Sequence, residues 1–218
     1  MDKIYLIQQF YIPNDKIRYL ETKTCLKINN NNKFIHKIIL LNEKIYTNKE
    51  LGFDSSQNKI QQINIKKRLK FKNIFEYIKN NNINGYIIIS NSDIYFNNSL
   101  INIYKLQFKS KRICLAQLRT EIKSNVIKIM QNASYSQDTW IYHSKHKINN
   151  INDFDFNFGV LGCDNNMCYY LNKDKFKLYN FPNLIKCIHL HKSKNRNGEL
   201  YHNKIKNSKI LHVKPIYF

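Results

Sequence analysis

The sequence predicts a single α/β domain in which helices flank a mixed, mainly parallel central sheet. In the first half of the chain, short apolar runs alternate with segments of helical periodicity, a pattern typical of doubly wound sheets. A length of 218 residues suits one such domain, with at most a small appendage, and it is enough to bury a large core. The 15 Tyr and 13 Phe residues argue against global disorder.

The stretch 85–96, GYIIISNSDIYF, is the centre of this prediction. Its apolar run from Tyr86 to Ile89 is followed at once by polar residues, as expected for a strand buried on both faces. Ligands of open α/β sheets bind beyond the carboxyl ends of the strands, where Asp93 lies. A carboxylate at that place can hold a divalent cation, and the cation can hold a diphosphate. The alternative is that Ser92 or Asp93 only caps the next segment.

The other elements follow from periodicity and from the turn residues between them. Strands are expected at 3–9, 34–41, 59–65, 112–118, 126–130, 178–181 and 185–191, and helices at 15–28, 71–78, 99–106 and after 165. The span 42–56 is polar and is expected to be irregular.

Two of the expected helices have a predicted inward face. In the helix at 15–28, which Asn14 is expected to cap, that face carries Ile17, Leu20, Thr24 and Ile28. In the helix at 71–78, apolar residues recur at i, i+3, i+4 and i+7, namely Phe71, Ile74, Phe75 and Ile78.

The formal charge of +21, from 36 Lys and Arg against 15 Asp and Glu, favours an anionic partner. Because the lysines are scattered and asparagine is also abundant, we interpret this charge mainly as a compositional bias and expect no specific nucleic-acid partner. No apolar run has the length of a transmembrane segment, and the start lacks the apolar region of a signal peptide. We therefore expect a cytoplasmic protein.

The five cysteines are widely spaced and form no CxxC pair, which argues against a structural zinc site and against a disulfide scaffold. The chain also lacks the GxxxxGK[ST] and GxGxxG motifs, so P-loop kinases and Rossmann dehydrogenases are disfavoured.

Four polar clusters lie at or near the ends of predicted elements, where functional sites are built. They are Ser92-Asp93, Gln137-Asp138, Asp164-Asn165 and the pair His189 and His191. Asp93 and a late histidine are suitable ligands for Mn²⁺ or Mg²⁺, and a separate carboxylate can accept a proton from an attacking hydroxyl. Each residue also has a structural interpretation: a turn or strand edge for Asp138, a helix cap for Asp164, and a core histidine for His189.

The order of these clusters resembles a known group of enzymes. NSDIYF, SQDTW, DFxFGxxGCDN and IKxxHLHxSxxR, together with the opening IYLIQQFY, resemble small GT-A-type glycosyltransferases. The resemblance is greatest to the glycosyltransferase domain of large DNA viruses that infect algae and to related bacterial and plant domains, and it spans 4–196. It implies one GT-A-like domain over 1–218, with a nucleotide-binding half at 1–118 and an acceptor and metal half at 119–218. For a viral protein, the expected location is the host cytoplasm.

The resemblance also implies a divalent metal, Mn²⁺ or Mg²⁺, and a nucleotide-sugar donor that is UDP- or GDP-linked. Asp93 would be the remaining acid of a DXD-like motif, which departs here from two-acid forms because Asn91, Ser92 and Tyr95 flank it. A histidine of the HLH piece would be the C-terminal metal ligand, with His189 preferred to His191.

The remaining implied roles concern the donor and the acceptor. The residues expected to bind the donor are Gln8, Gln9, Phe10, Ser92, Asp93 and Gln137, with Lys192 and Arg196 as charge partners of the diphosphate. Asp164 is the expected base that activates the acceptor, and Asp138 is the second candidate.

We therefore predict a metal-dependent glycosyltransferase that moves a sugar to a glycan or another hydroxyl acceptor. One alternative is a non-catalytic, basic nucleic-acid-binding protein, although no RNP1-like motif or clustered basic face is present. Another is a metal-dependent nuclease or nucleotidyltransferase with Asp93, Asp138 and Asp164 as metal ligands.

Overall fold

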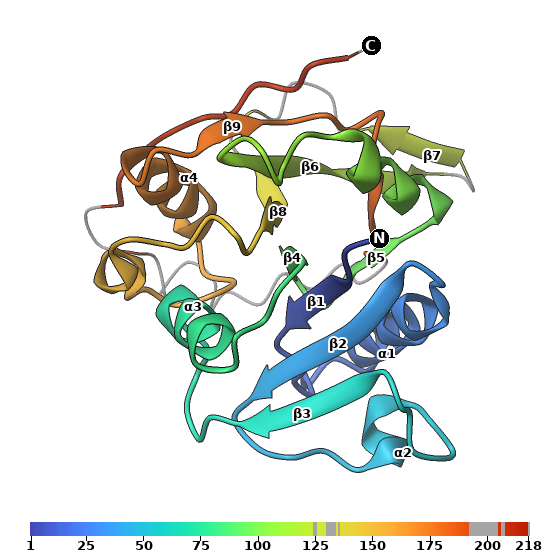
Figure 1. Ribbon diagram of the computed structural model, residues 1–218. Coiled ribbons are helices and arrows are strands. Elements are labelled where there is room, and N and C mark those ends of the chain that lie inside the picture. Colours follow the sequence, from blue (N-terminus) through green and yellow to red (C-terminus); the bar gives the residue numbers. More distant parts are fainter. Residues whose placement is uncertain (124–125, 130–133, 135, 192–204, 206–207, 218) are drawn as a thin grey trace.

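A computed structural model describes residues 1–123, 126–129, 134, 136–191, 205 and 208–217. They form one α/β domain with a curled, mixed sheet and helices on both of its faces, which confirms the predicted fold class (Figure 1). The predicted residues Lys192 and Arg196 lie outside the described residues.

The order of elements follows the predicted alternation in the first half of the chain. The strands are β1 (Ile4–Gln8), β2 (Ile35–Asn42), β3 (Ile60–Asn64), β4 (Tyr86–Ser90), β5 (Ile94–Phe96), β6 (Ile113–Lys123), β7 (Val126–Ile129), β8 (Gln137–His143), β9 (Lys177–Tyr179) and β10 (Cys187–His189). The helices are α1 (Lys16–Asn31), α2 (Asn48–Leu51), α3 (Phe71–Asn80), α4 (Cys163–Lys173) and the 3₁₀ helices η1 (Asn98–Lys105) and η2 (Ile151–Phe154).

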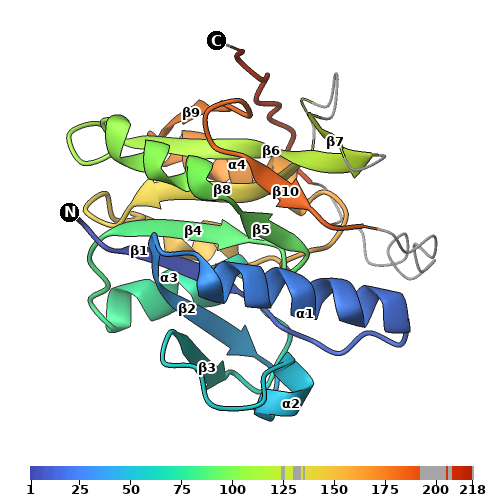
Figure 2. The same cartoon turned by 90° about the vertical axis from the view of Figure 1, so that its right-hand side faces the viewer.

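In the described chain the strands follow the spatial order β3-β2-β1-β4-β8-β6-β10-β5, with β7 and β9 also paired to β6. β1 runs parallel to β2 and β4, and β2 runs parallel to β3. β8 is antiparallel to both of its neighbours, while β10 is parallel to β6 and antiparallel to β5. As a result, β5 and β10 lie next to the edge where β4 ends (Figure 2).

The central strand β4 is buried on both faces, as its sequence predicts. Ile87 and Ile89 belong to the core under α3 and α4, whereas Tyr86 and Ile88 belong to the core under α1 and η1. Because side chains alternate along a strand, one uninterrupted apolar run supplies both cores. Burial of each isoleucine contributes roughly 1.5–3 kcal/mol.

The predicted inward face of α1 is wrong. Ile17 and Leu20 are 53% and 63% exposed, and the N-cap is Asp15 rather than Asn14. The buried face combines Cys25 and Leu26 with several polar residues, because it packs against the edge strand β5. Asn29 shows the reason: its side chain donates to the carbonyl of Ile94 and accepts from the N–H of Phe96. The buried face of α1 therefore supplies hydrogen bonds to a strand edge, which hydrophobic periodicity does not detect.

Several short or polar elements also differ from expectation. The polar span 42–56 contains α2, which begins with a capping box between Thr47 and Glu50. The predicted helix at 99–106 is the 3₁₀ helix η1, and β10 is shorter than the predicted strand. β5 and β8 were not predicted as strands, because β5 is very short and β8 begins with polar residues that are buried.

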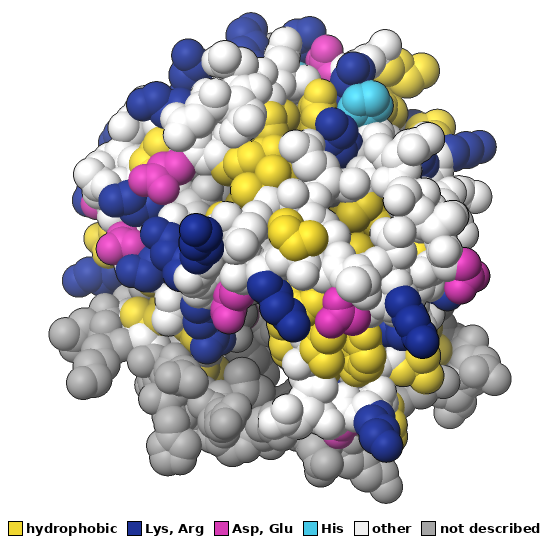
Figure 3. Space-filling view, turned by 90° about the horizontal axis from the view of Figure 1, so that it is seen from below, with side chains coloured by type: hydrophobic (Ala, Val, Ile, Leu, Met, Phe, Trp, Pro, Cys, Tyr) yellow, Lys and Arg dark blue, Asp and Glu magenta, His cyan; other side chains and the backbone are white. Residues whose placement is uncertain are grey.

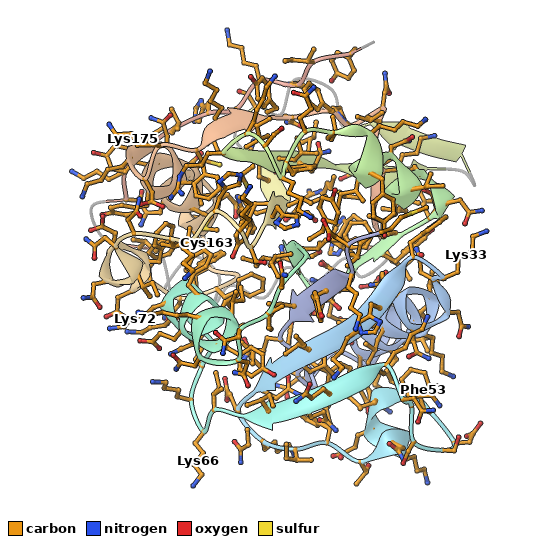
Figure 4. The ribbon with its side chains drawn as sticks, in the orientation of Figure 1. Lys33, Phe53, Lys66, Lys72, Cys163 and Lys175 are labelled. Atoms are coloured by element: carbon orange, nitrogen blue, oxygen red, sulfur yellow. The ribbon has the colours of Figure 1, made fainter. Side chains whose placement is uncertain are left out.

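The surface carries the excess of positive charge in scattered form. In the face shown in Figure 3, Lys and Arg side chains are scattered over the surface, with hydrophobic and acidic side chains between them. Figure 4 shows Lys33, Lys66, Lys72 and Lys175 pointing outward from four separate places on the fold. Among the described residues, we find no helix with the length and apolar character that crossing a membrane requires.

Candidate functional site

The candidate site lies at the carboxyl end of β4. The turn after Ser90 leads directly into β5, and β5 pairs with β10 so that Ile94 lies opposite His189. The N–H of Leu190 donates to the carbonyl of Asp93 over 3.0 Å. This pairing brings Asp93 and His189 together although 96 positions separate them, beside the N-terminal end of α1 (Figure 2).

The Asp93 carboxylate is buried, at 4% exposure, and one of its oxygens has two partners. Oδ2 accepts from Nη2 of Arg18 over 2.5 Å and lies 2.8 Å from Nε2 of His189. Burial alone would raise the pKa of Asp93, but the hydrogen bond and charge of His189 and the charge of Arg18 hold that pKa well below its usual range. Because an ionised carboxylate only accepts, Nε2 of His189 donates the proton in this contact.

The second histidine lies at the mouth of the site. The His191 ring stacks on His189, with ring centroids 5.2 Å apart and an interplanar angle of 11°. Its Nδ1 is 3.3 Å from Nη1 of Arg18, and the residue is exposed. His189 is therefore the histidine in contact with Asp93, while His191 contacts Arg18.

The residues present fit a divalent cation of the predicted kind. Oδ1 of Asp93 and Nδ1 of His189 are buried and have no hydrogen-bond partner among the described residues. No group of three or more His, Cys, Asp or Glu side chains suited to a metal is found in the described ranges. A cation held by Asp93 and His189 would take its other ligands from phosphate oxygens and water, as Mg²⁺ sites commonly do.

A second polar cluster adjoins this pair through Asn91. The Asn91 amide donates to Oδ1 of Asp138 over 2.8 Å, and its backbone N–H donates to the Asp138 carbonyl. Nη1 of Arg119 donates to Oδ2 of Asp138 over 3.2 Å, and Nε of Arg119 is 3.4 Å from Glu121. Burial alone would lower the pKa of Arg119, but Asp138 raises it. Asp138 is thus a carboxylate held in place by a cation and an amide.

Asp164 lies in the first turn of α4, and Gly162 is the N-cap. Gly162 has a φ of 89°, in the left-handed region that favours glycine, and this conformation starts the helix next to the site. The thiol of the neighbouring Cys163, which lies inside the molecule in Figure 4, donates to Oδ1 of Asp164. Burial and the nearby charge of Asp138 raise the pKa of Asp164 to about 8. Asp164 can therefore accept or release a proton near neutral pH.

The three residues predicted to border the nucleotide occupy different environments. Gln8 is buried, and its amide donates to the carbonyl of Asn91 over 2.8 Å. Phe10 is also buried, and its ring packs edge to face on Tyr46. Gln9 is partly exposed. Gln8 thus supports the loop that carries Asp93, whereas Gln9 is accessible to a ligand.

Gln137 and Ser92 also differ in their surroundings. Gln137 is fully buried, donates to the carbonyl of Ser134 and accepts from the thiol of Cys168 on α4. It therefore faces away from the neighbouring Asp138 side chain, because successive residues of a strand point to opposite faces. Ser92 is partly exposed, in the turn between β4 and β5.

Sequence reasoning missed the two arginines that hold the site carboxylates, Arg18 and Arg119. A compositional signal was available, because the chain has 5 Arg against 31 Lys. Arg forms planar, fixed contacts with carboxylates that Lys does not, so a rare Arg in a Lys-rich chain is a candidate for such a contact. The alternative ligand set of Asp93, Asp138 and Asp164 forms no metal cluster in the part of the chain that the structure describes.

The curled sheet and flanking helices have a GT-A-like fold, which the chain shares with solved transferases. No protein-family model and no curated protein matches the sequence.

Solved structures that are similar to this chain include three transferases. The 2-C-methyl-D-erythritol 4-phosphate cytidylyltransferase of Francisella tularensis has a TM-score of 0.52 at 14% identity, covering 92% of this chain and 97% of that one. The mannosyltransferase PcManGT of Pyrobaculum calidifontis, in complex with GDP-Man and Mn²⁺, has a TM-score of 0.57 at 8% identity over 90% of this chain. S. aureus TarS, in complex with UDP-GlcNAc, has a TM-score of 0.51 at 15% identity over 94% of this chain.

The chain spans 58% of the mannosyltransferase structure and 62% of the TarS structure. At these identities the likeness is one of fold. The resemblance to domains of algal viruses stays a prediction.

Proposed function

We propose that the protein transfers a sugar from a UDP- or GDP-linked donor to a glycan or another hydroxyl acceptor, with Mn²⁺ or Mg²⁺ held by Asp93 and His189. The buried contact between these two side chains carries the proposal, because it lies at the carboxyl end of β4, where ligands of α/β sheets bind. The mannosyltransferase of similar fold holds GDP-Man and Mn²⁺, which supports a site of this kind.

A divalent cation at this place would supply Lewis-acid stabilisation of the departing diphosphate. The Asp93 carboxylate and the His189 imidazole are the groups that would hold it. Lys192 and Arg196, which follow β10 in the chain, are proposed to contact the diphosphate with their positive charge.

Asp164 is the proposed base. In the transfer step the bond between the anomeric carbon and the diphosphate oxygen breaks, and the acceptor oxygen forms a new bond to that carbon. The proton of the acceptor hydroxyl passes to the Asp164 carboxylate, whose raised pKa makes it a stronger base than an ordinary aspartate. Asp138, held by Arg119, is proposed to face the sugar, where a carboxylate stabilises oxocarbenium character.

The remaining predicted residues divide by burial. Gln9 and Ser92 are partly exposed and are proposed to contact the donor directly. Gln8, Phe10 and Gln137 are buried. They are proposed to position the loops and strands that carry the contacting groups, without touching the donor themselves.

The test is a product assay with the purified protein, Mn²⁺ and a panel of UDP and GDP sugars. We expect release of the nucleoside diphosphate together with transfer of the sugar to an added glycan, and loss of both in Asp93→Asn. Asp155→Asn, at an exposed surface pair with Lys70, is the matched control. Absence of any Mn²⁺-dependent transfer across a broad panel of donors and acceptors would overturn the proposal.

Nucleotidyl transfer is the second candidate, because the chain spans nearly the full length of the Francisella cytidylyltransferase structure. One local feature favours glycosyl transfer. The loop after β1 contains Pro13, which has no backbone N–H, and it contains no glycine, the residue that lets a backbone approach a triphosphate closely. Nucleoside triphosphates with sugar phosphates as substrates separate the two reactions, since nucleotidyl transfer releases pyrophosphate.

A further inference from the structure

Arg18 is the third member of the Asp93–His189 contact. It comes from the first turn of α1, and its side chain is 24% exposed, whereas the Asp93 side chain is 6% exposed. Nη2 donates to Oδ2 of Asp93, the same oxygen that His189 contacts. A guanidinium therefore lies at the carboxylate oxygen that faces the proposed metal ligand.

A guanidinium and a divalent cation on one carboxylate oxygen repel each other strongly in a buried site. A metal ion bound through Oδ2 of Asp93, the oxygen that faces His189, therefore needs Arg18 to withdraw. The surroundings of Arg18 allow this, because Nη1 is 3.4 Å from Oε2 of Glu21, one turn further along α1. Its other described partners, Nδ1 of His191 and the Tyr11 hydroxyl, also lie on side chains. Arg18 can thus leave Asp93 and keep a carboxylate partner.

A second arginine in the chain shows what a fixed pair looks like. Arg112 donates to Asp174 over the same distance, 2.5 Å, with the same exposure of 24%. Unlike Arg18, it also donates to the backbone carbonyls of Asp174 and Lys147, and its guanidinium lies over the Phe176 ring. These backbone contacts hold Arg112 in place. The described contacts of Arg18 are with side chains, as expected for a group that changes partner.

We propose that Arg18 is an exchangeable counter-ion of Asp93. It neutralises the buried carboxylate while the donor site is empty, gives way when the metal and the donor bind together, and then donates to the diphosphate. The inference rests on the proposed metal and donor site. It implies that the metal alone binds weakly, because it must displace Arg18, and that the diphosphate supplies the new partner for the displaced guanidinium.

The inference predicts two opposite effects of one substitution. In Arg18→Gln, the affinity for Mn²⁺ alone should rise about 10- to 100-fold, the range that one charge-assisted contact covers. The affinity for UDP or GDP in saturating Mn²⁺ should fall by a similar factor, because the diphosphate loses a cationic donor. Arg18→Lys keeps the charge and should leave the affinity for Mn²⁺ alone close to that of the unsubstituted protein.

The measurement is Mn²⁺ titration by electron paramagnetic resonance, followed by calorimetric titration with UDP and with GDP. Arg112→Gln is the matched control and should change neither affinity. Arg18→Met, which keeps the aliphatic packing, replaces Arg18→Gln if melting shows that the latter is unfolded. Unchanged or weaker binding of Mn²⁺ alone in folded Arg18→Gln or Arg18→Met would overturn the exchange. A loss of nucleotide affinity in these variants without a gain in Mn²⁺ affinity would overturn it as well.

Asp93→Asn separates this inference from the proposed function. If Asp93→Asn loses Mn²⁺ and nucleotide binding while Arg18→Gln matches the unsubstituted protein, the metal site stands and the exchange fails. If Asp93→Asn binds Mn²⁺ and nucleotide normally, the assignment of the metal site is wrong, and the proposed exchange of Arg18 is refuted as well.

Discussion

The environment of Asp164 predicts a specific pH dependence of transfer. Burial and the charge of Asp138 raise the pKa of Asp164 to about 8. If its ionised form is the base, only about a tenth of the protein carries an active base at pH 7, and nearly all of it does at pH 9. The transfer rate should therefore rise about tenfold between pH 7 and pH 9, with a midpoint near 8.

Two substitutions test this assignment. Asp164→Asn keeps the shape and removes the base, so the rate at pH 9 should fall about 10²–10⁴-fold and the rise with pH should disappear. Asp138→Asn removes the neighbouring negative charge, which should move the midpoint to lower pH. The assay is the initial rate of sugar transfer in saturating Mn²⁺ and donor, with Asp155→Asn as the surface control.

The same raised pKa predicts a change in stability, which is measured without any substrate. A carboxyl group with a raised pKa in the folded state contributes stability that is present below its unfolded pKa. That stability is lost as the pH rises through the folded pKa. The melting temperature of the unsubstituted protein should therefore fall more between pH 6 and pH 9 than that of Asp164→Asn. Near-normal transfer by Asp164→Asn, with an unaltered pH profile, would refute the assignment and favour Asp138.

Three further predictions concern the metal, the core and the charge. Asp93→Asn should abolish Mn²⁺-dependent nucleotide binding in calorimetry while circular dichroism stays unchanged; normal nucleotide affinity in this variant would contradict the metal assignment. Leu26→Ala, on the buried face of α1, should lower the free energy of unfolding by about 2–5 kcal/mol in urea. Leu20→Ala, on the exposed face, should change the free energy of unfolding by no more than about 0.5 kcal/mol. Equal losses of stability in the two variants would contradict the assignment of the buried face of α1. Binding to duplex DNA should be weak and steeply salt-dependent in fluorescence anisotropy, and sequence-specific nanomolar binding at physiological salt would favour the nucleic-acid-binding alternative.

The sequence by itself determined the elements whose apolar pattern is strong. The run at 86–89 specifies a strand buried on both faces, and the spacing of Phe71, Ile74, Phe75 and Ile78 specifies the inward face of α3. These predictions succeed because burial of apolar surface is the largest favourable term in folding, and it acts on residues close together in the chain. The position of Asp93 at a strand end follows from the same pattern.

Only the tertiary structure determined which polar residues are buried. The face of α1 that packs inward contains Asn29, since an edge strand offers backbone groups that need partners. The start of β8 is buried although Gln137 and Asp138 are polar, because α4, Asn91 and Arg119 satisfy their side chains. No local periodicity encodes such partners, which come from other parts of the chain.

The candidate site was likewise decided in three dimensions. His189 meets Asp93 only because β10 pairs with β5, and Arg18 reaches the same oxygen only because α1 begins beside that edge. The raised pKa of Asp164 requires burial and a second carboxylate that lies 26 positions earlier in the chain, as Asp138. Electrostatic contacts of this kind depend on distances of a few ångströms, and the packing of the strands sets those distances.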